Sequence, residues 1–363
     1  MSYSLSVKCN SRKFRLKRSI AKAGRSAARR NTALVIGIGV QSQELRLIAV
    51  AENNKVAINI KSAWLSYLGE DYVFETLCAS VQRLKPVAVE FCAWGYRDKG
   101  MLERFRERGF PASRYEDGFI RTLQSHGIRE QGYSVVRDSR DLYFHYAHPT
   151  DLEALIAGND LATQPGNLAR TQAAIDLFKQ RRITKFGIEP SGDFDLPFAD
   201  PFLLVIGQVE HDQSIHHGSP HVKTNARLAE IARAENPGAT IVYKPHPQVL
   251  IRPELVASHV DPVRPHVDHV LDSRNVALTD LLALRPHLYT ITSGAGFEAL
   301  IYGCKVTTLG GPYYAGWGLT DDRLDFPRRT VRRTVQDIFW SAYMNYTRFC
   351  DLERGTVVPV IDV

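Results

Sequence analysis

The stretch LYTITSGAGFEALIYGCKVTTLG, residues 288–310, carries the pattern from which we predict the fold. It begins with a short run rich in β-branched and aromatic residues, continues through a turn that contains Gly294 and Gly296, and then reads as an apolar helix. A second β-rich run ends the stretch. A strand, a helix and another strand in this order predict a βαβ unit, and βαβ units build parallel sheets.

The same alternation extends along most of the 363 residues. Helical patterns separate seven β-rich runs, which begin at Ala33, Lys55, Pro86, Phe202, Ala239, Leu288 and Lys305. The chain is longer than one typical domain, so we predict an α/β protein with two domains.

The domain boundaries are predicted from breaks in composition. The stretch ITKFGIEPSGDFDLPFADP, residues 183–201, is rich in proline, glycine and aspartate and has no clear period, which is typical of a linker. We expect a basic tail over 1–30, an N-terminal domain over 31–185, a linker over 186–200 and a C-terminal domain over 201–328. An amphipathic helix within 329–363 is expected to pack back on the N-terminal domain.

The net charge of +7 comes from one end of the chain. Residues 1–30 hold ten Lys and Arg and no acidic residue, which leaves 36 bases against 39 acids in the rest. A block of like charge is usually solvated and mobile. A solvated tail and an organellar transit peptide are the alternatives to the partner that we expect for residues 1–30, an anionic membrane surface. Nucleic acid is not expected as a partner, because only Tyr3 and Phe14 are available for stacking.

The sequence predicts a cytosolic location. No apolar run approaches the 18 or so residues of a membrane span, and no apolar segment with a cleavage site is present. The five cysteines are odd in number and lack C-x-x-C spacing, which indicates reduced thiols.

Candidate site residues follow the predicted strands, where α/β domains bind ligands. In YKPHPQVL, residues 243–250, a strand ends in Lys244 and His246 between prolines that stop it from continuing. In TSGAGFE, a helix begins after Thr292, Ser293 and Gly294, and its free N–H groups suit a phosphate. Glu298, in the first turn of that helix, is a candidate acceptor for ribose hydroxyls.

Two further stretches have the same placement. In GQVEHD, the strand ending at Ile206 leads to Gln208 and Glu210. In EDGFIRT, Glu116 and Asp117 precede a glycine and Arg121.

Each stretch also has a purely structural interpretation. The helix after Ser293 can be a capping box closed by Glu298, and a histidine at a strand end is more often structural than catalytic. The sequence DFD at 193–195 is interpreted as a loop without a ligand. The pair His216 and His217 has no third ligand at a suitable spacing, so no metal site is predicted.

Taken together, the stretches resemble bacterial sialyltransferase-like enzymes that use CMP-activated sugars. They are most similar to the capsule polysaccharide β-Kdo transferases, where Kdo is 3-deoxy-D-manno-octulosonic acid. The matching segments are EDGFIRT (116–122), YSVVRDSRDLYFHYAHPTDLEALI (133–156), GQVEHDQSI (207–215), NPGATIVYKPHPQVL (236–250) and TSGAGFEALIYGCKVTTLGGPYYAGWGLTDD (292–322). The resemblance runs from about Ala93 to Asp322. The stretch RTLQSHGIREQG, residues 121–132, departs from the family's usual continuation, and family members often carry two transferase modules where this chain has room for one.

This resemblance implies a GT-B architecture, in which two Rossmann-like domains face a cleft and the C-terminal one holds most of the donor. It implies transfer of Kdo from CMP-Kdo to a glycolipid or oligosaccharide acceptor, at the inner face of the cytoplasmic membrane and without a cofactor or divalent metal. The membrane contact of residues 1–30 would hold the protein near a lipid-linked acceptor. The leaving phosphate would be stabilised by Lys244 and His246 on one side and by Thr292, Ser293 and the helix N-terminus on the other.

The resemblance assigns the remaining roles to the acidic turn and its neighbours. Asp117 would be the nucleophile of a retaining double displacement, and the sequence leaves open that it is a general base in a single displacement. Glu116 would hold Asp117 in place or share its proton load, and Arg121 would pair with the sugar carboxylate. Gln208 and Glu210 are expected to contact the nucleotide or Kdo.

Two other function classes stay open at this point. One is a non-catalytic export or scaffold component that binds polysaccharide, and the other is a GT-B enzyme that uses another nucleotide sugar, such as a UDP-sugar epimerase. The aromatic residues Tyr313, Tyr314 and Trp317 either wall the sugar site or pack in the core.

Overall fold

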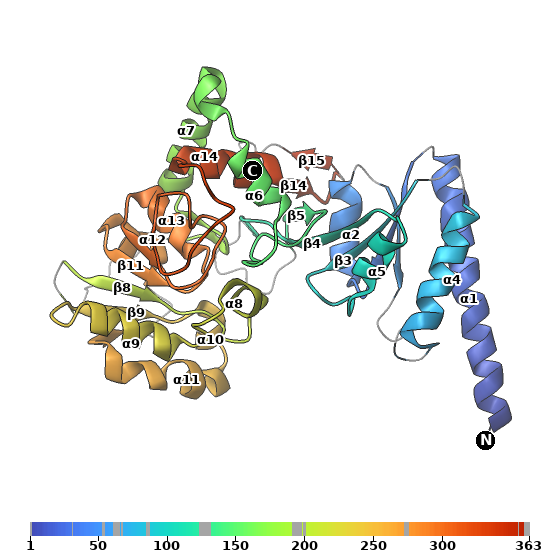
Figure 1. The fold of residues 1–363 in the computed structure, drawn as a ribbon, viewed down its shortest axis with the longest axis horizontal. Helices are drawn as coiled ribbons and strands as arrows, with labels where there is room; N and C mark the ends of the chain where they lie inside the picture. The colour runs from blue at the N-terminus through green and yellow to red at the C-terminus, as the bar shows by residue number, and fades with distance from the viewer. Residues whose placement is uncertain are drawn as a thin grey trace. The chain divides into compact units, whose positions relative to one another are not determined.

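The computed structural model describes residues 2–30, 32–52, 55–60, 66, 68–84, 88–122, 132–190, 198, 201–271, 276–354 and 356–358, and of residues 2–14, 56, 253 and 358 the backbone alone. The chain forms two compact units, coloured along the sequence in Figure 1. The first unit comprises residues 1–117, 131–142 and 348–363, and the second comprises residues 118–130 and 143–347. Both are α/β units, as the alternating pattern predicts.

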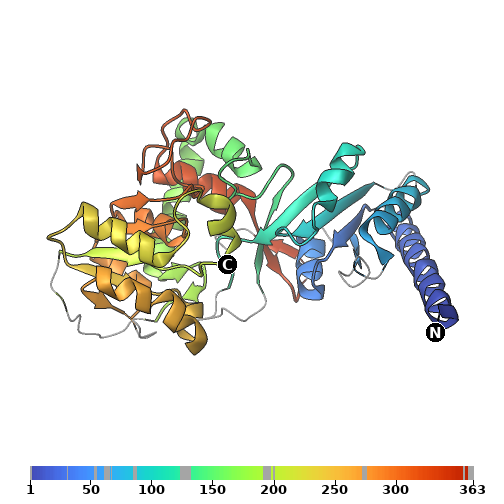
Figure 2. The ribbon, with the colours of Figure 1, turned by 60° about the horizontal axis from the view of Figure 1, so that its bottom comes forward.

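The first unit is built on a seven-stranded sheet with the order β15-β14-β5-β4-β3-β1-β2. Strands β1 to β4 are parallel, while β5 is antiparallel to β4 and β15 to β14. Its strands are β1 (Leu34–Ile38), β2 (Val56–Ile60), β3 (Val89–Trp94), β4 (Ala112–Asp117), β5 (Ser134–Asp138), β14 (Thr347–Asp351) and β15 (Thr356–Val358). Its helices are α1 (Ser2–Arg29), α2 (Ser42–Ala51), α4 (Glu70–Gln82) and α5 (Met101–Glu107). In Figure 2 the red strands β14 and β15 lie beside segments from the first half of the chain.

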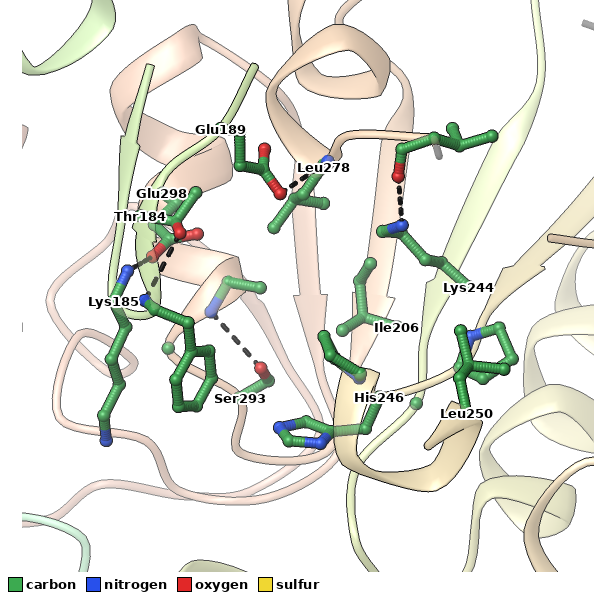
Figure 3. A pocket seen from close by; sticks show the side chains of 17 residues that line it. Thr184, Lys185, Glu189, Ile206, Lys244, His246, Leu250, Leu278, Ser293 and Glu298 are labelled. Carbon is green, nitrogen blue, oxygen red and sulfur yellow. Dashed lines mark hydrogen bonds between the residues drawn. The ribbon is translucent and has the colours of Figure 1, made fainter. Parts of the chain in front are cut away.

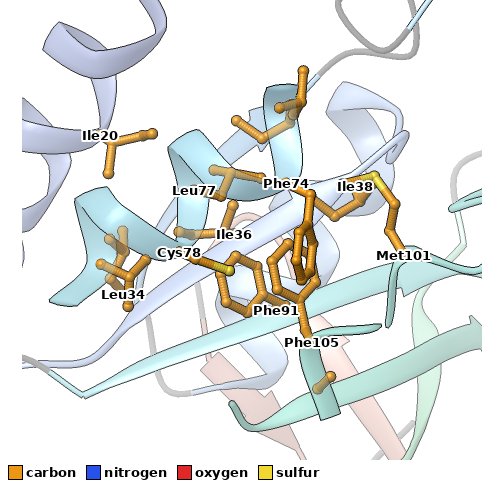
Figure 4. Packing of buried hydrophobic residues seen from close by; sticks show 14 of the residues in the cluster. Ile20, Leu34, Ile36, Ile38, Phe74, Leu77, Cys78, Phe91, Met101 and Phe105 are labelled. Carbon is orange, nitrogen blue, oxygen red and sulfur yellow. The ribbon is translucent and has the colours of Figure 1, made fainter. Parts of the chain in front are cut away.

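The core of the first unit explains why its strands read as continuous apolar runs. All five residues of β1 are buried, because helices cover both faces of a parallel sheet. On one face, the rings of Phe91 and Phe105 stack with their centroids 3.6 Å apart (Figure 4).

Four buried cysteines, Cys78, Cys92, Cys304 and Cys350, are free thiols, as expected from their spacing.

Helix α1 corrects the prediction that residues 1–30 form a solvated tail. Leu16, Ile20, Ala23 and Ala27 are buried in the same cluster as β1 and α4. They recur every three or four residues, so one face of the helix is apolar and packs on the unit. Within the described residues, no helix combines the length and the apolar character that crossing a bilayer requires.

The second unit contains a six-stranded parallel sheet with the order β10-β9-β8-β11-β12-β13. The strands are β8 (Leu203–Ile206), β9 (Ile241–Lys244), β10 (His269–Val270), β11 (His287–Thr290), β12 (Val306–Thr308) and β13 (Asp321–Asp322). In chain order this is the Rossmann arrangement, and the order reverses between β8 and β11. Ligands of such sheets bind beyond the carboxyl ends of the strands at this switch point.

The helices of the second unit are α6 (Asp151–Ala157), η1 (Leu161–Thr163), α7 (Pro165–Gln180), α8 (Gln213–Gly218), α9 (Asn225–Glu235), α10 (Pro247–Leu250), α11 (Pro253–His259), η2 (Asp261–His266), α12 (Leu278–Ala283), α13 (Ala295–Tyr302), α14 (Val335–Phe339) and the π-helix η3 (Trp340–Tyr346). The predicted βαβ unit is β11-α13-β12, with Leu288 opposite Val306 in parallel register. Helix α13 stops at Gly303, whose φ of 83° is left-handed, a conformation that glycine adopts at helix ends. Helix α9 covers the sheet face on the opposite side from α13 (Figure 1).

The units differ from the predicted domain boundaries in three places. Residues 143–185 belong to the second unit instead of the first. The C-terminal helix, α14 and η3, packs on α6 and α7 as predicted, but these helices belong to the second unit, and the segment that rejoins the first unit is the strand pair β14-β15. The predicted linker begins inside a hairpin, β6 (Ile183–Thr184) and β7 (Gly187–Ile188), while residues 191–197, 199 and 200, including DFD, lie outside the described residues.

Candidate functional site

A pocket lies at the switch point of the second sheet. Ile206 ends β8 and Gly207 follows it, Lys244 ends β9 and His246 lies two residues beyond, and Ser293 precedes α13. The opposite wall is formed by the β6-β7 hairpin and by the segment that leads into α12 (Figure 3). The structure therefore brings five predicted site residues to one cavity: Lys244, His246, Ser293, Gly294 and Glu298.

His246 has its two ring nitrogens in different environments. Its Nδ1 accepts the backbone N–H of Gln248 at 3.1 Å and so caps α10. Burial lowers the pKa of His246 to about 4, a shift that Asp212 opposes and Lys185 reinforces. The ring is neutral at pH 7, and because Nδ1 is an acceptor, Nε2 carries the proton and can donate it.

The turn before α13 offers a hydroxyl at the mouth of a helix. Ser293 Oγ accepts the N–H of Ala295 at 3.2 Å, and its own O–H can still donate. The Ser293 carbonyl accepts a hydrogen bond from the Tyr314 hydroxyl at 2.6 Å, which holds the turn in place. A side chain at Gly296 would collide with that tyrosine ring.

Glu298 does not close a capping box. Its Oε1 accepts the backbone N–H of Lys185 at 2.8 Å, which ties the β6-β7 hairpin to α13. Burial raises the pKa of Glu298 to about 7, even though the hydrogen bond from Lys185 acts to lower it. The carboxyl group is therefore poised between its charged and neutral forms near physiological pH.

Lys244 points away from His246 in Figure 3. Its ammonium donates to the Val276 carbonyl at 2.6 Å, and burial lowers its pKa, while Glu189 acts to raise it. The Lys244 ammonium and the His246 imidazole therefore face different parts of the pocket. The sequence suggested instead that both act on the same phosphate.

The β6-β7 hairpin contributes site residues that the sequence analysis missed. Phe186 packs edge-on against His246, with ring centroids 5.6 Å apart, and Lys185 lines the same wall. Glu189 accepts the N–H groups of Leu278 and Thr279 at 3.0 and 2.8 Å, which anchors the hairpin to the start of α12. These residues lie where the composition predicted a linker, and the short β-rich run ITKFGI was the one available signal.

Gln208, Glu210 and Thr292 lie outside the residues that line the pocket and act as structural links. Gln208 donates to Thr292 Oγ1 at 3.0 Å and accepts the Thr292 N–H at 2.9 Å, so it joins the segments after β8 and β11. Glu210 accepts the N–H of Asn225 at 2.8 Å at the start of α9.

The acidic turn belongs to the first unit, and Arg121 to the second. Glu116 and Asp117 end β4. Glu116 Oε1 accepts the Trp94 indole N–H at 3.1 Å and the Asp117 backbone N–H at 3.0 Å, so it steadies the turn. The Arg121 N–H donates to the Lys185 carbonyl at 2.8 Å, which joins the segment after the turn to the hairpin of the pocket wall.

The aromatic residues after β12 pack in the core. Tyr313, Tyr314 and Trp317 are buried, and the Trp317 indole donates to the Tyr313 carbonyl at 2.9 Å. Tyr313 also packs against Phe119 and Phe297. They support the turn before α13 and do not line the pocket.

Comparison with known proteins agrees with this architecture. Residues 179–349 match the family described as capsule polysaccharide biosynthesis protein. Lipopolysaccharide-processing protein LpsZ of Rhizobium meliloti is 34% identical over 273 residues, which are 74% of this chain and 62% of LpsZ. Capsule polysaccharide modification protein LipA of Neisseria meningitidis serogroup B is 33% identical over 295 residues, or 77% of this chain and 40% of LipA. The chain thus spans only part of these relatives.

Two solved structures from Thermosulfurimonas dismutans KpsC match most of the fold. The β-Kdo 2,7 transferase is 29% identical with a TM-score of 0.67, and the match covers 90% of this chain and 96% of that one. The β-Kdo 2,4 transferase is 25% identical with a TM-score of 0.72, and the match covers 90% and 95%. By sequence over residues 179–349 the chain matches the capsule polysaccharide biosynthesis proteins, and by fold over most of its length it resembles the KpsC β-Kdo transferases.

Proposed function

We propose that the chain is a GT-B glycosyltransferase that moves Kdo from CMP-Kdo to a glycolipid or oligosaccharide acceptor during synthesis of a capsule or related surface polysaccharide. The observation that carries the proposal is the pocket at the switch point, where a neutral histidine and a serine hydroxyl stand at the mouth of α13. The likeness to two β-Kdo transferase structures supports Kdo as the sugar.

In the proposed reaction the bond between the anomeric carbon and the phosphate oxygen breaks, and its electron pair leaves with CMP. Negative charge then develops on the phosphate, so groups that donate hydrogen bonds to it lower the barrier. His246 donates through Nε2, and Ser293 donates through its hydroxyl beside the N-terminus of α13. Lys244, bonded to the Val276 carbonyl, binds the donor at the other side of the pocket.

Asp117 is the proposed nucleophile. Its carboxylate attacks the anomeric carbon as CMP leaves, and the acceptor hydroxyl then displaces the carboxylate, so two inversions retain the β configuration. Arg121 pairs with the carboxylate of the sugar. Glu116, which already accepts the Asp117 N–H, holds the nucleophile in place.

Incubation with a panel of CMP- and UDP-sugars tests the proposal. We expect consumption of CMP-Kdo together with acceptor, release of CMP, and a rate that EDTA does not change, because the phosphate is stabilised by protein donors alone. The purified chain should also melt at a higher temperature with CMP than with UMP, because a ligand that binds only the folded state stabilises it.

Three results would contradict the proposal. Consumption of a UDP-sugar instead of CMP-Kdo would favour the alternative nucleotide-sugar enzyme. No shift with either nucleotide would favour a non-catalytic polysaccharide-binding component. Loss of activity in EDTA, restored by a divalent cation, would overturn the metal-free mechanism.

A further inference from the structure

Helix α1 presents a row of basic residues on the side away from the protein core. Arg15, Arg18, Lys22, Arg25 and Arg29, here called the basic stripe, are all exposed and recur at intervals of three and four residues. At 100° per residue the stripe is centred about 150° around the helix from the buried row, and it extends about 21 Å along the axis.

The buried row fixes the stripe to the first unit. Leu16, Ile20, Ala23 and Ala27 pack in the core cluster, and α1 contacts α4 and β2 (Figures 1 and 4). At Gly24 the helix comes close to the side chain of Leu84, just after α4, and a Cβ there would force that side chain to shift. The stripe is thus a surface of a folded unit.

Within the described part of the chain, the basic stripe has no acidic partner. Residues 1–30 contain no Asp or Glu, and among the described side chains none forms an ion pair with the stripe. Other arginines of the same unit do find carboxylates, as Arg97 does with Glu44 and Arg108 with Glu75, both at 2.8 Å. Like charges three or four residues apart destabilise a helix, so an external anion would relieve a strain that the fold leaves in place.

We infer that the basic stripe docks the first unit onto a membrane rich in anionic lipid. A straight row of five cations on a rigid helix can meet many headgroups at once, and each Lys or Arg near such a surface adds to the attraction. The stripe has no aromatic residue for stacking on nucleic-acid bases. Because the core occupies the apolar row, the contact made by residues 15–29 is electrostatic, and this described part of α1 has no apolar row left to insert into the acyl chains.

This inference is independent of the sugar that the pocket uses, so either proposal can fail alone. Its test is sedimentation of the full chain with vesicles of phosphatidylcholine, with or without about 30% phosphatidylglycerol, near 0.1 M salt. We expect binding only to the phosphatidylglycerol vesicles, and we expect salt of about 0.5 M to remove most of it because the charges are screened.

A triple variant identifies the surface. Arg18→Gln with Lys22→Gln and Arg25→Gln should weaken binding about 100-fold, because each charge near the surface is worth roughly fivefold in affinity. A control in the second unit, Arg170→Gln with Arg252→Gln and Lys305→Gln, changes the net charge equally at exposed positions and should bind as the parent does. The control should melt as the parent does, the stripe variant should melt no lower because it loses like-charge repulsion, and both should keep the CMP-induced shift.

Several results would overturn the inference. They are equal binding to phosphatidylcholine vesicles, equal losses in the two triple variants, or full binding by the stripe variant. Salt-resistant binding would show insertion instead of surface docking. Stripe-dependent binding to a single-stranded oligonucleotide, with none to vesicles, would assign the surface to a soluble polyanion.

Discussion

His246 shows how one backbone contact decides what a side chain can do. Sequence places a histidine between prolines after a strand but leaves its charge and tautomer open. In the fold, the Gln248 N–H bonds to Nδ1 and burial lowers the pKa to about 4, so the proton of the neutral ring is on Nε2. The Gln248 N–H thus determines that Nε2 is the hydrogen-bond donor of the ring. The sequence does not predict this contact, because the prolines force a turn without specifying how the ring is oriented.

At Asp117 a single isosteric change separates the chemistry from the binding. Asp117→Asn should lower the transfer rate by about 10²–10⁴-fold or more, since the amide is neither a nucleophile nor a base. The CMP-induced rise in melting temperature should be kept. Assays of CMP release measure the first effect, and Glu107→Gln, an exposed carboxylate at the end of α5, serves as the control.

Incubating the parent with CMP-Kdo and no acceptor distinguishes the two roles of Asp117. A double displacement predicts a mass increase of one Kdo unit on the peptide that contains Asp117. The absence of that adduct in an enzyme that still turns over would make the residue a general base. Wild-type transfer by Asp117→Asn would remove it from the mechanism altogether.

The buried carboxyl of Glu298 predicts an unusual pH dependence of stability. Its pKa is about 7 in the fold against an ordinary 4.5, so between these pH values the folded state holds one more proton than the unfolded state. Stability therefore decreases as the pH rises through this window, by about 3 kcal/mol in total. Glu298→Gln keeps an oxygen for the Lys185 N–H but cannot ionise, so the variant should lack this decrease.

Melting temperatures measured from pH 4.5 to 8 check this expectation. The variant should match the parent at the acidic end and exceed it above pH 7. Glu254→Gln, at an exposed position on α11, should follow the parent throughout. Parallel profiles for the parent and Glu298→Gln would mean that the carboxyl does not titrate in this range.

At the scale of elements, apolar parallel strands were predictable from the sequence, and strands held in place by distant contacts were not. The seven β-rich runs correspond to β1, β2, β3, β8, β9, β11 and β12, because buried parallel strands have a strong apolar signature. The β6-β7 hairpin has two residues in each strand, and its stability comes from distant links such as Glu189 to the start of α12. Such tertiary contacts leave no local pattern in the sequence, so the pocket wall formed by the β6-β7 hairpin could not be predicted.

The packing of helix α1 was not predicted, because ten charges in thirty residues outweigh the signal of four small or aliphatic side chains on the opposite face. Ile20→Ala tests the docked helix. Ile20 is fully buried, so the change should destabilise the first unit by about 2–5 kcal/mol through lost burial and a cavity.

Ser19→Ala, one position away and exposed, is the matched control and should have little effect. Urea unfolding followed by circular dichroism measures both variants. An unchanged unfolding midpoint for Ile20→Ala would restore the description of residues 1–30 as a solvated tail.

At the scale of the whole molecule, the α/β fold class and the likeness to capsule polysaccharide biosynthesis proteins could be predicted from the sequence, but the division into two units could not. Alternating patterns and the motif order indicate two α/β halves. The structure, however, gives residues 143–185 to the second unit, because α6 and α7 pack on α14 and η3, which lie more than 150 residues later. Composition breaks mark local changes along the chain and carry no information about such distant packing.

The return of β14 and β15 to the first sheet has a consequence for the order in which the protein can be completed during synthesis. Strand β5 has no neighbour on one side until β14 is synthesised. All strands of the Rossmann sheet in the second unit are therefore synthesised before the sheet of the first unit can be completed. Until then β5 is an open edge that can pair with another chain. The half that is translated first is the last to be finished.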